Sequence, residues 1–139
     1  MDNFLEKELS YNIVGCFYDV RNKYGSDHSE RVYHRTLAEH FYFKGIKYVS
    51  EPKIEVYSVD TGKIIAIYVP DFLVEDKIIV EIKAKEFDYI KFYKQTIEYL
   101  KTSKYEIAYL VNFGEQSFEP KRFIYTNDRK NFMSLIKER

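Results

Sequence analysis

The sequence is poor in residues that cross-link or anchor a chain. It contains one cysteine, Cys16, and no tryptophan among 139 residues. A single cysteine excludes an intrachain disulfide and fits a reducing compartment, so we expect a cytoplasmic protein. Cys16 falls in an apolar helical pattern, which indicates a core residue rather than a nucleophile. No apolar run approaches 18 residues, and the first residues lack a basic region followed by an apolar block, which disfavours secretion and membrane spanning.

The sequence also lacks a net charge, because 22 basic residues balance 22 acidic ones. A neutral chain is unsuited to indiscriminate binding of polyanions. The charges are distributed unevenly, with 9 basic and 13 acidic residues in 1–76 and 13 basic and 9 acidic in 77–139. This asymmetry permits a phosphate-facing surface without requiring one.

The hydrophobic pattern predicts one domain, residues 1–139, of the α/β class, with a mixed β-sheet flanked by helices. Apolar residues at three- and four-residue spacing predict helices that end at Gly25 and before Gly45, and a third over 88–101. We expect 46–59 to form an edge strand, and 64–74, apolar on both faces, to form an interior strand covered by helices. Further strands are expected at 78–84, 106–113 and 122–125, and a terminal helical turn at 132–136.

Three charged side chains interrupt the apolar hairpin over 64–84: Asp71, Glu81 and Lys83. Side chains alternate between faces along a strand, so Glu81 and Lys83 share a face with Ile79. If the hairpin turns about Asp76, Asp71 lies opposite Glu81 at roughly 5 Å, a spacing at which two carboxylates can share a divalent cation. Without a cation, their repulsion costs roughly 3 kcal/mol at an effective dielectric of about 20. The pair therefore indicates a cation site.

The simpler alternative is a buried ion pair between Lys83 and one of the two acids, because buried charges are usually paired. The tripeptide Glu-x-Lys occurs four times in the chain and carries no weight alone. Only Glu81-Ile82-Lys83 lies within an apolar strand that follows a Pro-Asp pair on the preceding strand. Because Lys83 can balance only one acid, the remaining negative charge favours a metal.

Glu30, near the start of the second helix, has two interpretations. Asp27-x-x-Glu30 has the spacing of a capping box, which would make Glu30 structural. Glu30 also lies three residues before Tyr33, so its carboxylate would project from the apolar stripe toward the sheet.

The chain resembles the PD-(D/E)XK nuclease superfamily, because Pro70-Asp71 and then Glu81-Ile82-Lys83 lie on successive strands. The surrounding order of helix, three strands, helix and strand implies a restriction-endonuclease-like core. Over about residues 9–125 the chain more closely resembles the GxxExxY proteins, a branch of that superfamily. The motifs that carry this closer resemblance are Gly25 with Glu30-Arg31-Val32-Tyr33, residues 95–100, Asn112-Phe113-Gly114 and Lys121-Arg122. Asp27 departs from the branch, which usually has a second glycine at this position.

The resemblance implies that Asp71, Glu81 and the backbone carbonyl of Ile82 bind Mg²⁺, with Mn²⁺ as a substitute. It also implies that an acid on the preceding helix, here Glu30, joins them, so both interpretations of Glu30 stay open. Carboxylates suit a hard cation, which activates water and neutralises charge at phosphorus. Lys83 would orient that water or stabilise the transition state.

Gln95 and Tyr99 match a Gln-x-x-x-Tyr helical motif of one group of these nucleases, in which the glutamine helps to fix the site. The resemblance thus implies that they position the substrate. The alternative is a solvated helix face, on which four-residue spacing has no functional meaning.

These observations predict a Mg²⁺-dependent nuclease that hydrolyses phosphodiester bonds in nucleic acid, with DNA favoured over RNA as the partner. We expect no membrane partner, and a homodimer is compatible with the pattern. The leading alternative is a non-catalytic nucleic-acid-binding or protein-interaction module that retains the nuclease fold. A third interpretation is a structural protein with a buried ion pair.

Overall fold

The computed structural model describes residues 4–136 of the chain. No helix in this part of the chain is both long and apolar enough to span a bilayer. The elements are α1 (Lys7–Tyr24), α2 (Glu30–Phe43), β1 (Tyr48–Ser50), β2 (Ile54–Tyr57), β3 (Ile64–Tyr68), β4 (Phe72–Val74), β5 (Ile78–Lys83), α3 (Tyr89–Thr102), β6 (Ile107–Asn112), β7 (Lys121–Ile124), a 3₁₀ turn (Asn127–Arg129) and α4 (Phe132–Ile136).

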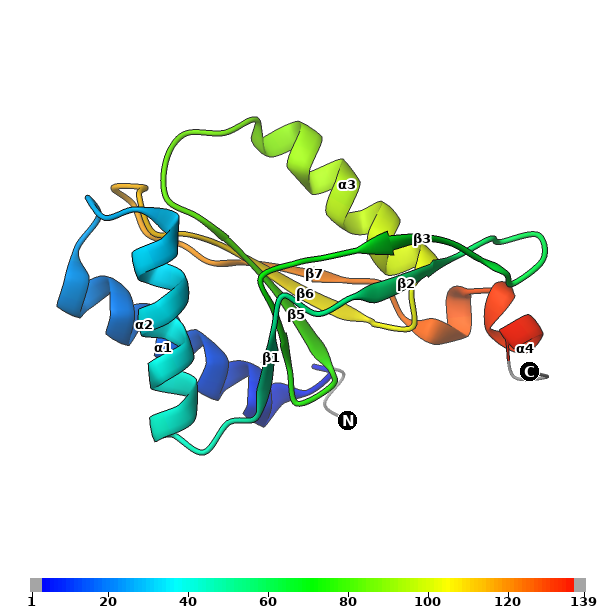
Figure 1. The fold of residues 1–139 in the computed structure, drawn as a ribbon, viewed down its shortest axis with the longest axis horizontal. Helices are drawn as coiled ribbons and strands as arrows, with labels where there is room; N and C mark the ends of the chain where they lie inside the picture. Colours follow the sequence, from blue (N-terminus) through cyan, green and yellow to red (C-terminus); the bar gives the residue numbers. More distant parts are fainter. Residues whose placement is uncertain (1–3, 137–139) are drawn as a thin grey trace.

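Five strands form one mixed sheet in the order β1-β4-β5-β6-β7 (Figure 1). β5 and β6 are parallel and are joined through α3, whereas the other neighbouring strands are antiparallel. β2 and β3 form a separate two-stranded sheet. The predicted α/β class, with a mixed sheet flanked by helices, is confirmed.

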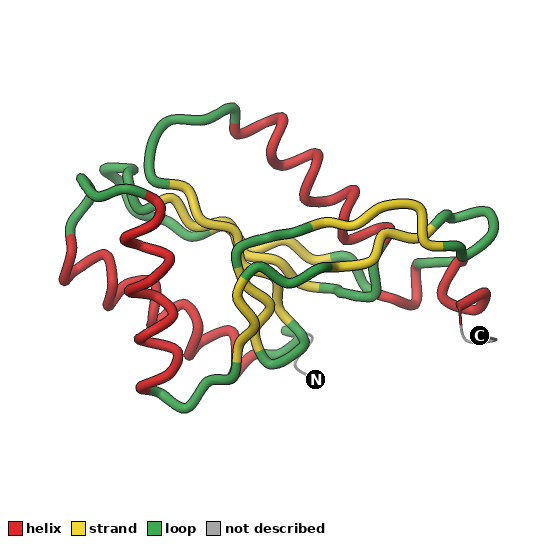
Figure 2. Tube along the Cα trace, viewed as in Figure 1, coloured by secondary structure: helices red, strands yellow, loops and turns green. Residues whose placement is uncertain are grey.

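Helices lie on both sides of the five-stranded sheet (Figure 2). On one face, α1 and α2 cover an apolar cluster that includes Phe17, Leu37 and Phe72. On the other face, α3 and the β2–β3 pair cover a second cluster that includes Leu100 and Ile79. The central strands are therefore buried on both faces, as their nearly continuous apolar sequences require.

The prediction of single strands over 46–59 and 64–74 is wrong. The first run divides into β1 and β2, and the second into β3 and β4. Pro52 and Pro70 lie in the two interruptions, because a residue without an N–H cannot continue a strand ladder. The N–H of Glu51 donates to the carbonyl of Asp71 at 2.8 Å, so the interruptions face each other. Together they form one bend in a long hairpin.

The prediction that 64–74 is an interior strand covered on both faces is also wrong for its first half. Ile65 and Ile67 of β3 are 65% and 52% exposed. Within the described chain β3 pairs only with β2, and its inward face packs through Tyr68. Its outer face therefore remains in solvent.

The hairpin from β4 to β5 turns about Asp76, as predicted. Val74 pairs with Ile78, which centres the turn on Asp76. Glu75 and Asp76 have φ values of 52° and 56°, and the N–H of Lys77 donates to the carbonyl of Val74 at 3.0 Å. Two consecutive left-handed residues give a turn whose twist matches that of antiparallel strands.

Gly114→Ala is expected to destabilise the fold. Gly114 follows β6, where a Cβ atom would overlap the backbone carbonyl of Ala84 just after β5. We expect the free energy of unfolding, measured by urea denaturation, to fall by about 1–3 kcal/mol, because two backbones would have to separate.

Gly15→Ala inside α1 is the matched control, since the nearest atom to its added Cβ is Lys44 Nζ at 3.8 Å. This change should raise the stability by about 0.5–1 kcal/mol. An unchanged stability of Gly114→Ala would show that the close approach of the two strand ends is not a constraint.

Candidate functional site

The bend in the hairpin places Asp71 directly opposite Glu81. The register of β4 with β5 pairs Phe72 with Val80, and the next pair along is Asp71 with Glu81, as predicted. The N–H of Asp71 donates to Glu81 Oε1 at 3.0 Å, and the N–H of Ile82 donates to Asp71 Oδ2 at 2.7 Å. Each carboxylate is thus held by the backbone of the opposite strand.

Glu81 and Lys83 face α3. Val80 and Ile82 belong to the apolar cluster under α1 and α2, whereas Ile79 belongs to the cluster under α3. Because side chains alternate along β5, the two charged residues share the face of Ile79, as predicted.

The Glu81 carboxyl has a strongly perturbed pKa. Burial first, and then the neighbouring charge of Asp71, raise the pKa of Glu81 to about 8. The N–H of Asp71 and the charge of Lys83 act in the opposite direction, and Glu30 adds a small further rise. Burial also raises the pKa of Tyr68, and the charge of Glu81 adds to that rise. An acid perturbed by both burial and a specific charge is typical of functional sites.

Lys83 lies near the acids without pairing with either. Its Nζ is 4.7 Å from the ring centroid of Phe92 and 5.9 Å from that of Phe87. Between residues 4 and 136, no ion pair of Lys83 is formed, so the predicted alternative of a buried ion pair is wrong. Aromatic faces attract an ammonium group but leave the negative charge of the acids uncompensated.

Ser29, and not Asp27, caps α2. The Ser29 hydroxyl accepts a hydrogen bond from the N–H of Val32 at 3.4 Å, and Glu30 is the first helical residue. The capping box of Asp27 with Glu30 is therefore wrong, because Ser29 already supplies the acceptor. Glu30 is exposed and lines, together with Asp71, a groove of about 820 Å³ between α2 and β1.

His34 is a site residue that the sequence analysis missed. Its ring stacks on Phe72, with centroids 4.2 Å apart. Its Nδ1 lies 3.3 Å from Asp71 Oδ1, and its Nε2 lies 2.7 Å from the Ser50 hydroxyl. An ionised carboxylate only accepts, so Nδ1–H donates to Asp71, which leaves Nε2 for the hydrogen bond with the Ser50 hydroxyl. The available signal was the four-residue spacing from Glu30, which puts both side chains on one helix face.

Gln95 and Tyr99 occupy different environments on α3. Tyr99 is half-buried and stacks on Tyr68, with ring centroids 3.8 Å apart and planes inclined by 8°. Tyr68 in turn lies close enough to Glu81 that, beyond the effect of burial, the Glu81 charge raises the pKa of Tyr68. Gln95, one turn earlier, is exposed. The structure thus connects Tyr99 to the site through one ring and leaves Gln95 in solvent.

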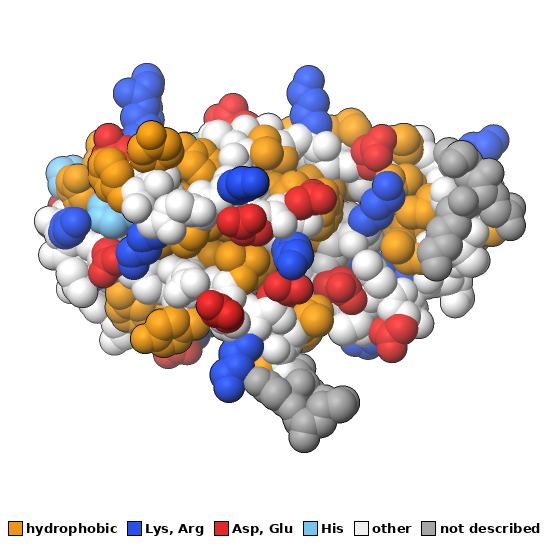
Figure 3. Space-filling view, turned by 90° about the horizontal axis from the view of Figure 1, so that it is seen from below, with side chains coloured by type: hydrophobic (Ala, Val, Ile, Leu, Met, Phe, Trp, Pro, Cys, Tyr) orange, Lys and Arg blue, Asp and Glu red, His pale blue; other side chains and the backbone are white. Residues whose placement is uncertain are grey.

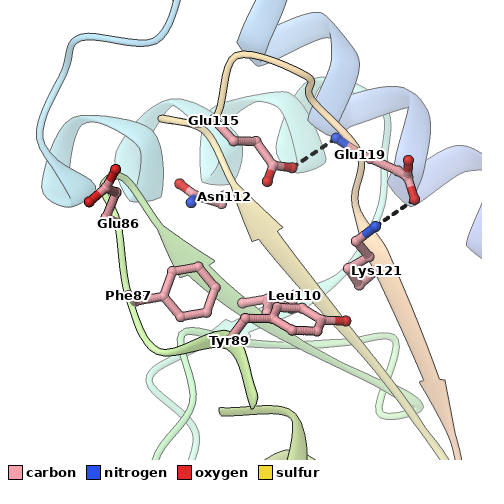
Figure 4. Close-up of a pocket in the computed structure, with 8 residues that line it drawn as sticks. All are labelled: Glu86, Phe87, Tyr89, Leu110, Asn112, Glu115, Glu119 and Lys121. Carbon is pink, nitrogen blue, oxygen red and sulfur yellow. Dashed lines mark hydrogen bonds and ion pairs between the residues drawn. The ribbon is translucent and has the colours of Figure 1, made fainter. Parts of the chain in front are cut away.

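A smaller cavity, about 390 Å³, lies between the β5–α3 and β6–β7 connections and is lined by Phe87, whose ring centroid is 5.9 Å from Lys83 Nζ (Figure 4). Asn112, which is in register with Lys83 on the neighbouring strand, is one of its lining residues. The others are Glu86, Phe87, Tyr89, Leu110, Glu115, Glu119 and Lys121. This cavity is mainly acidic in its charged groups.

Asp71 and Glu81 fit a Mg²⁺ site. The described residues contain no group of three or more His, Cys, Asp and Glu side chains arranged around one point. Mg²⁺ does not need such a group, because one or two carboxylates usually hold it while water and substrate phosphates complete its octahedron. The two carboxylates repel when both are ionised, and within residues 4–136 neither forms an ion pair with a lysine or arginine, so a divalent cation would relieve that repulsion.

A family model described as the PD-(D/E)XK nuclease superfamily matches residues 7–123. The matched span includes α1, α2, α3 and the central strands, and with them Glu30, Asp71, Glu81 and Lys83. A comparison with curated proteins gives no match.

Metal-free protein is expected to lose stability as the pH rises. The pKa of folded Glu81 is raised to about 8, against 4.5 for the free group, so the folded chain binds more protons between these limits. The free energy of unfolding should therefore fall by roughly 2–5 kcal/mol between about pH 4.5 and 8.

Urea denaturation in a chelator at several pH values measures this fall. Glu81→Gln cannot titrate and should lack that part of the pH dependence. An unchanged pH profile in Glu81→Gln would contradict the raised pKa.

Proposed function

Because the chain belongs to the PD-(D/E)XK nuclease superfamily, we propose that it is a Mg²⁺-dependent nuclease whose catalytic residues are Asp71, Glu81 and Lys83. One observation carries this proposal: two acids on neighbouring strands hold each other through backbone hydrogen bonds, at 3.0 and 2.7 Å, although their charges repel. A pair preorganised in this way against its own repulsion is suited to binding a divalent cation.

Asp71, Glu81 and the backbone carbonyl of Ile82 would hold the cation, and Glu30 would join them from α2. Bound Mg²⁺, or Mn²⁺ in its place, supplies positive charge at the scissile phosphate and lowers the pKa of a water molecule beside it. The acids need little rearrangement, because hydrogen bonds from the opposite strand already fix Asp71 and Glu81.

Lys83 would act on the phosphate itself. Its ammonium group rests against Phe92 on the acidic face of β5, and its long stem can turn toward a substrate oxygen. There it would stabilise the negative charge that develops in the transition state or orient the attacking water. We assign Gln95 and Tyr99 to substrate positioning, Tyr99 acting through its contact with Tyr68.

We place DNA ahead of RNA as the substrate, and attack by an activated water permits cleavage of DNA, which has no 2′-hydroxyl group. The order of motifs from Gly25 to Lys121-Arg122 supports assignment to the GxxExxY branch. A single domain over 1–139, a cytoplasmic location and a homodimer stay predictions, and the exposed isoleucines of β3 offer an apolar surface for self-association.

Lys83→Ala is expected to separate binding from turnover. Lys83 contributes charge at the reacting phosphate but is not a metal ligand, so Mg²⁺ binding and nucleic-acid affinity should be retained. Cleavage of single- and double-stranded DNA and RNA should fall on the order of a hundredfold or more.

Lys85→Ala, an exposed lysine two residues later, is the matched control and should cleave like the wild type. Equal cleavage by Lys83→Ala and the wild type would contradict the mechanism. A wild type that cleaves no substrate with Mg²⁺ or Mn²⁺ would favour the non-catalytic module that retains the fold.

Glu30→Gln should weaken metal binding, measured by calorimetric titration with Mn²⁺. Because Ser29 caps α2, the loss of the Glu30 charge should change stability by less than about 1 kcal/mol. Glu8→Gln, which removes an exposed acid from the first turn of α1, controls for the helix dipole. Metal affinity that is the same in both variants would exclude Glu30 from the ligand set.

A further inference from the structure

One cavity borders the proposed catalytic centre, and a second lies close to it. The first is the groove of about 820 Å³ between α2 and β1, which contains Asp71 and Glu30. The second is the cavity of about 390 Å³ beside α3, which contains Phe87, a ring in contact with Lys83. A nucleic-acid strand could approach from either side, and the two sides differ in whether their cations are paired with acids.

The cavity beside α3 is unfavourable for a phosphate backbone. Glu86, Glu115 and Glu119 line it, and its lysine, Lys121, is already paired with Glu119 (Figure 4). Because Glu119 and Lys121 neutralise each other, the carboxylates of Glu86 and Glu115 remain uncompensated in the described chain, and the lining offers no unpaired lysine or arginine. Phosphates approaching through it would be repelled.

The groove between α2 and β1 carries free cations close to the acids. Arg31 and Arg35 line it, are exposed, and are four residues apart, a rise of about 6 Å along α2. In the part of the chain that the structure describes, neither guanidinium forms a hydrogen bond or an ion pair. They follow directly after Glu30 and His34, the two α2 residues of the site.

The attraction in this groove is local. Four carboxylates, those of Glu30, Glu39, Glu51 and Asp71, line it beside the two arginines, so acids outnumber the arginines in the groove as a whole. Side chains of both signs are likewise interspersed on the face shown in Figure 3, without a continuous basic field. A phosphate backbone would therefore be recognised by specific contacts rather than by a general positive potential.

We propose that the nucleic-acid strand reaches Asp71 and Glu81 through the groove between α2 and β1, where Arg31 and Arg35 bind its phosphates. This inference rests on the proposed nuclease function. A planar guanidinium pairs with two phosphate oxygens at once, and an unpaired one has no protein partner to give up. The Ser50 hydroxyl and the Tyr48 ring line the opposite wall, on β1.

The test compares two double variants of the full chain. Arg31→Gln/Arg35→Gln removes the groove cations, and Lys91→Gln/Lys94→Gln removes two exposed lysines of α3 as the matched control. Thermal melting verifies that both fold. Binding is measured by fluorescence anisotropy with a labelled 30-nucleotide DNA strand, its duplex and the corresponding RNA, at several salt concentrations. An added Asp71→Asn change prevents cleavage during the titration, and cleavage kinetics are measured with Asp71 intact.

The arginine variant should bind at least tenfold more weakly, and the slope of log Kd against log salt should fall by about 1.4–1.8, as expected for two lost phosphate contacts. KM should rise while kcat is retained, and Arg31→Lys/Arg35→Lys should recover part of the affinity. The lysine variant should resemble the wild type.

Two results would overturn this inference but not the proposed function. In the first, the wild type cleaves and the arginine variant has the same KM and salt slope. In the second, the lysine variant loses affinity and the arginine variant does not. A wild type that neither binds nor cleaves any of the probes would overturn the proposed function, and the groove assignment with it.

Discussion

The site depends on a bend in a long hairpin. Pro52 and Pro70 interrupt two paired strands at the same level, and the N–H of Glu51 closes the bend on the carbonyl of Asp71. On one side of the bend, β2 and β3 pair with each other outside the main sheet. On the other side, β1 and β4 belong to the main sheet. Asp71 therefore lies where the hairpin departs from the five-stranded sheet, opposite Glu81.

At the bend, the fold holds two acids close together although their charges repel when both are ionised. Glu81 and Asp71 repel, and burial raises the pKa of Glu81 to about 8. The surrounding structure could relieve the repulsion by pairing Lys83 with one acid, but its ammonium group lies against Phe92 and Phe87 instead. The chain thus keeps a negative pair and a nearby unpaired cation on one face of β5. On the proposed function, this arrangement lowers stability in the absence of metal and leaves the acids and the lysine free to bind ligands.

Much of this site could be predicted from the sequence, because strand geometry is periodic. Asp71 and Glu81 are each five residues from Asp76, so a hairpin that turns at Asp76 places them opposite each other. Alternation along β5 then fixes the face of Lys83. Two kinds of error arose where longer-range packing decides. Pro52 and Pro70 were visible, but that they bend the same hairpin follows only from the pairing of their strands. His34 reaches Asp71 because α2 packs across the start of β4, a tertiary contact that no local pattern contains.

The central claim is that Asp71 and Glu81 form a metal centre, and a crystal soaked in Mn²⁺ tests it most directly. Anomalous scattering at the manganese absorption edge would locate the ion without reference to activity. The account predicts a peak within ligand distance of both carboxylates and of the Ile82 carbonyl. Absence of a peak there at saturating Mn²⁺, with the hydrogen bond between the Asp71 N–H and Glu81 unchanged, would contradict it.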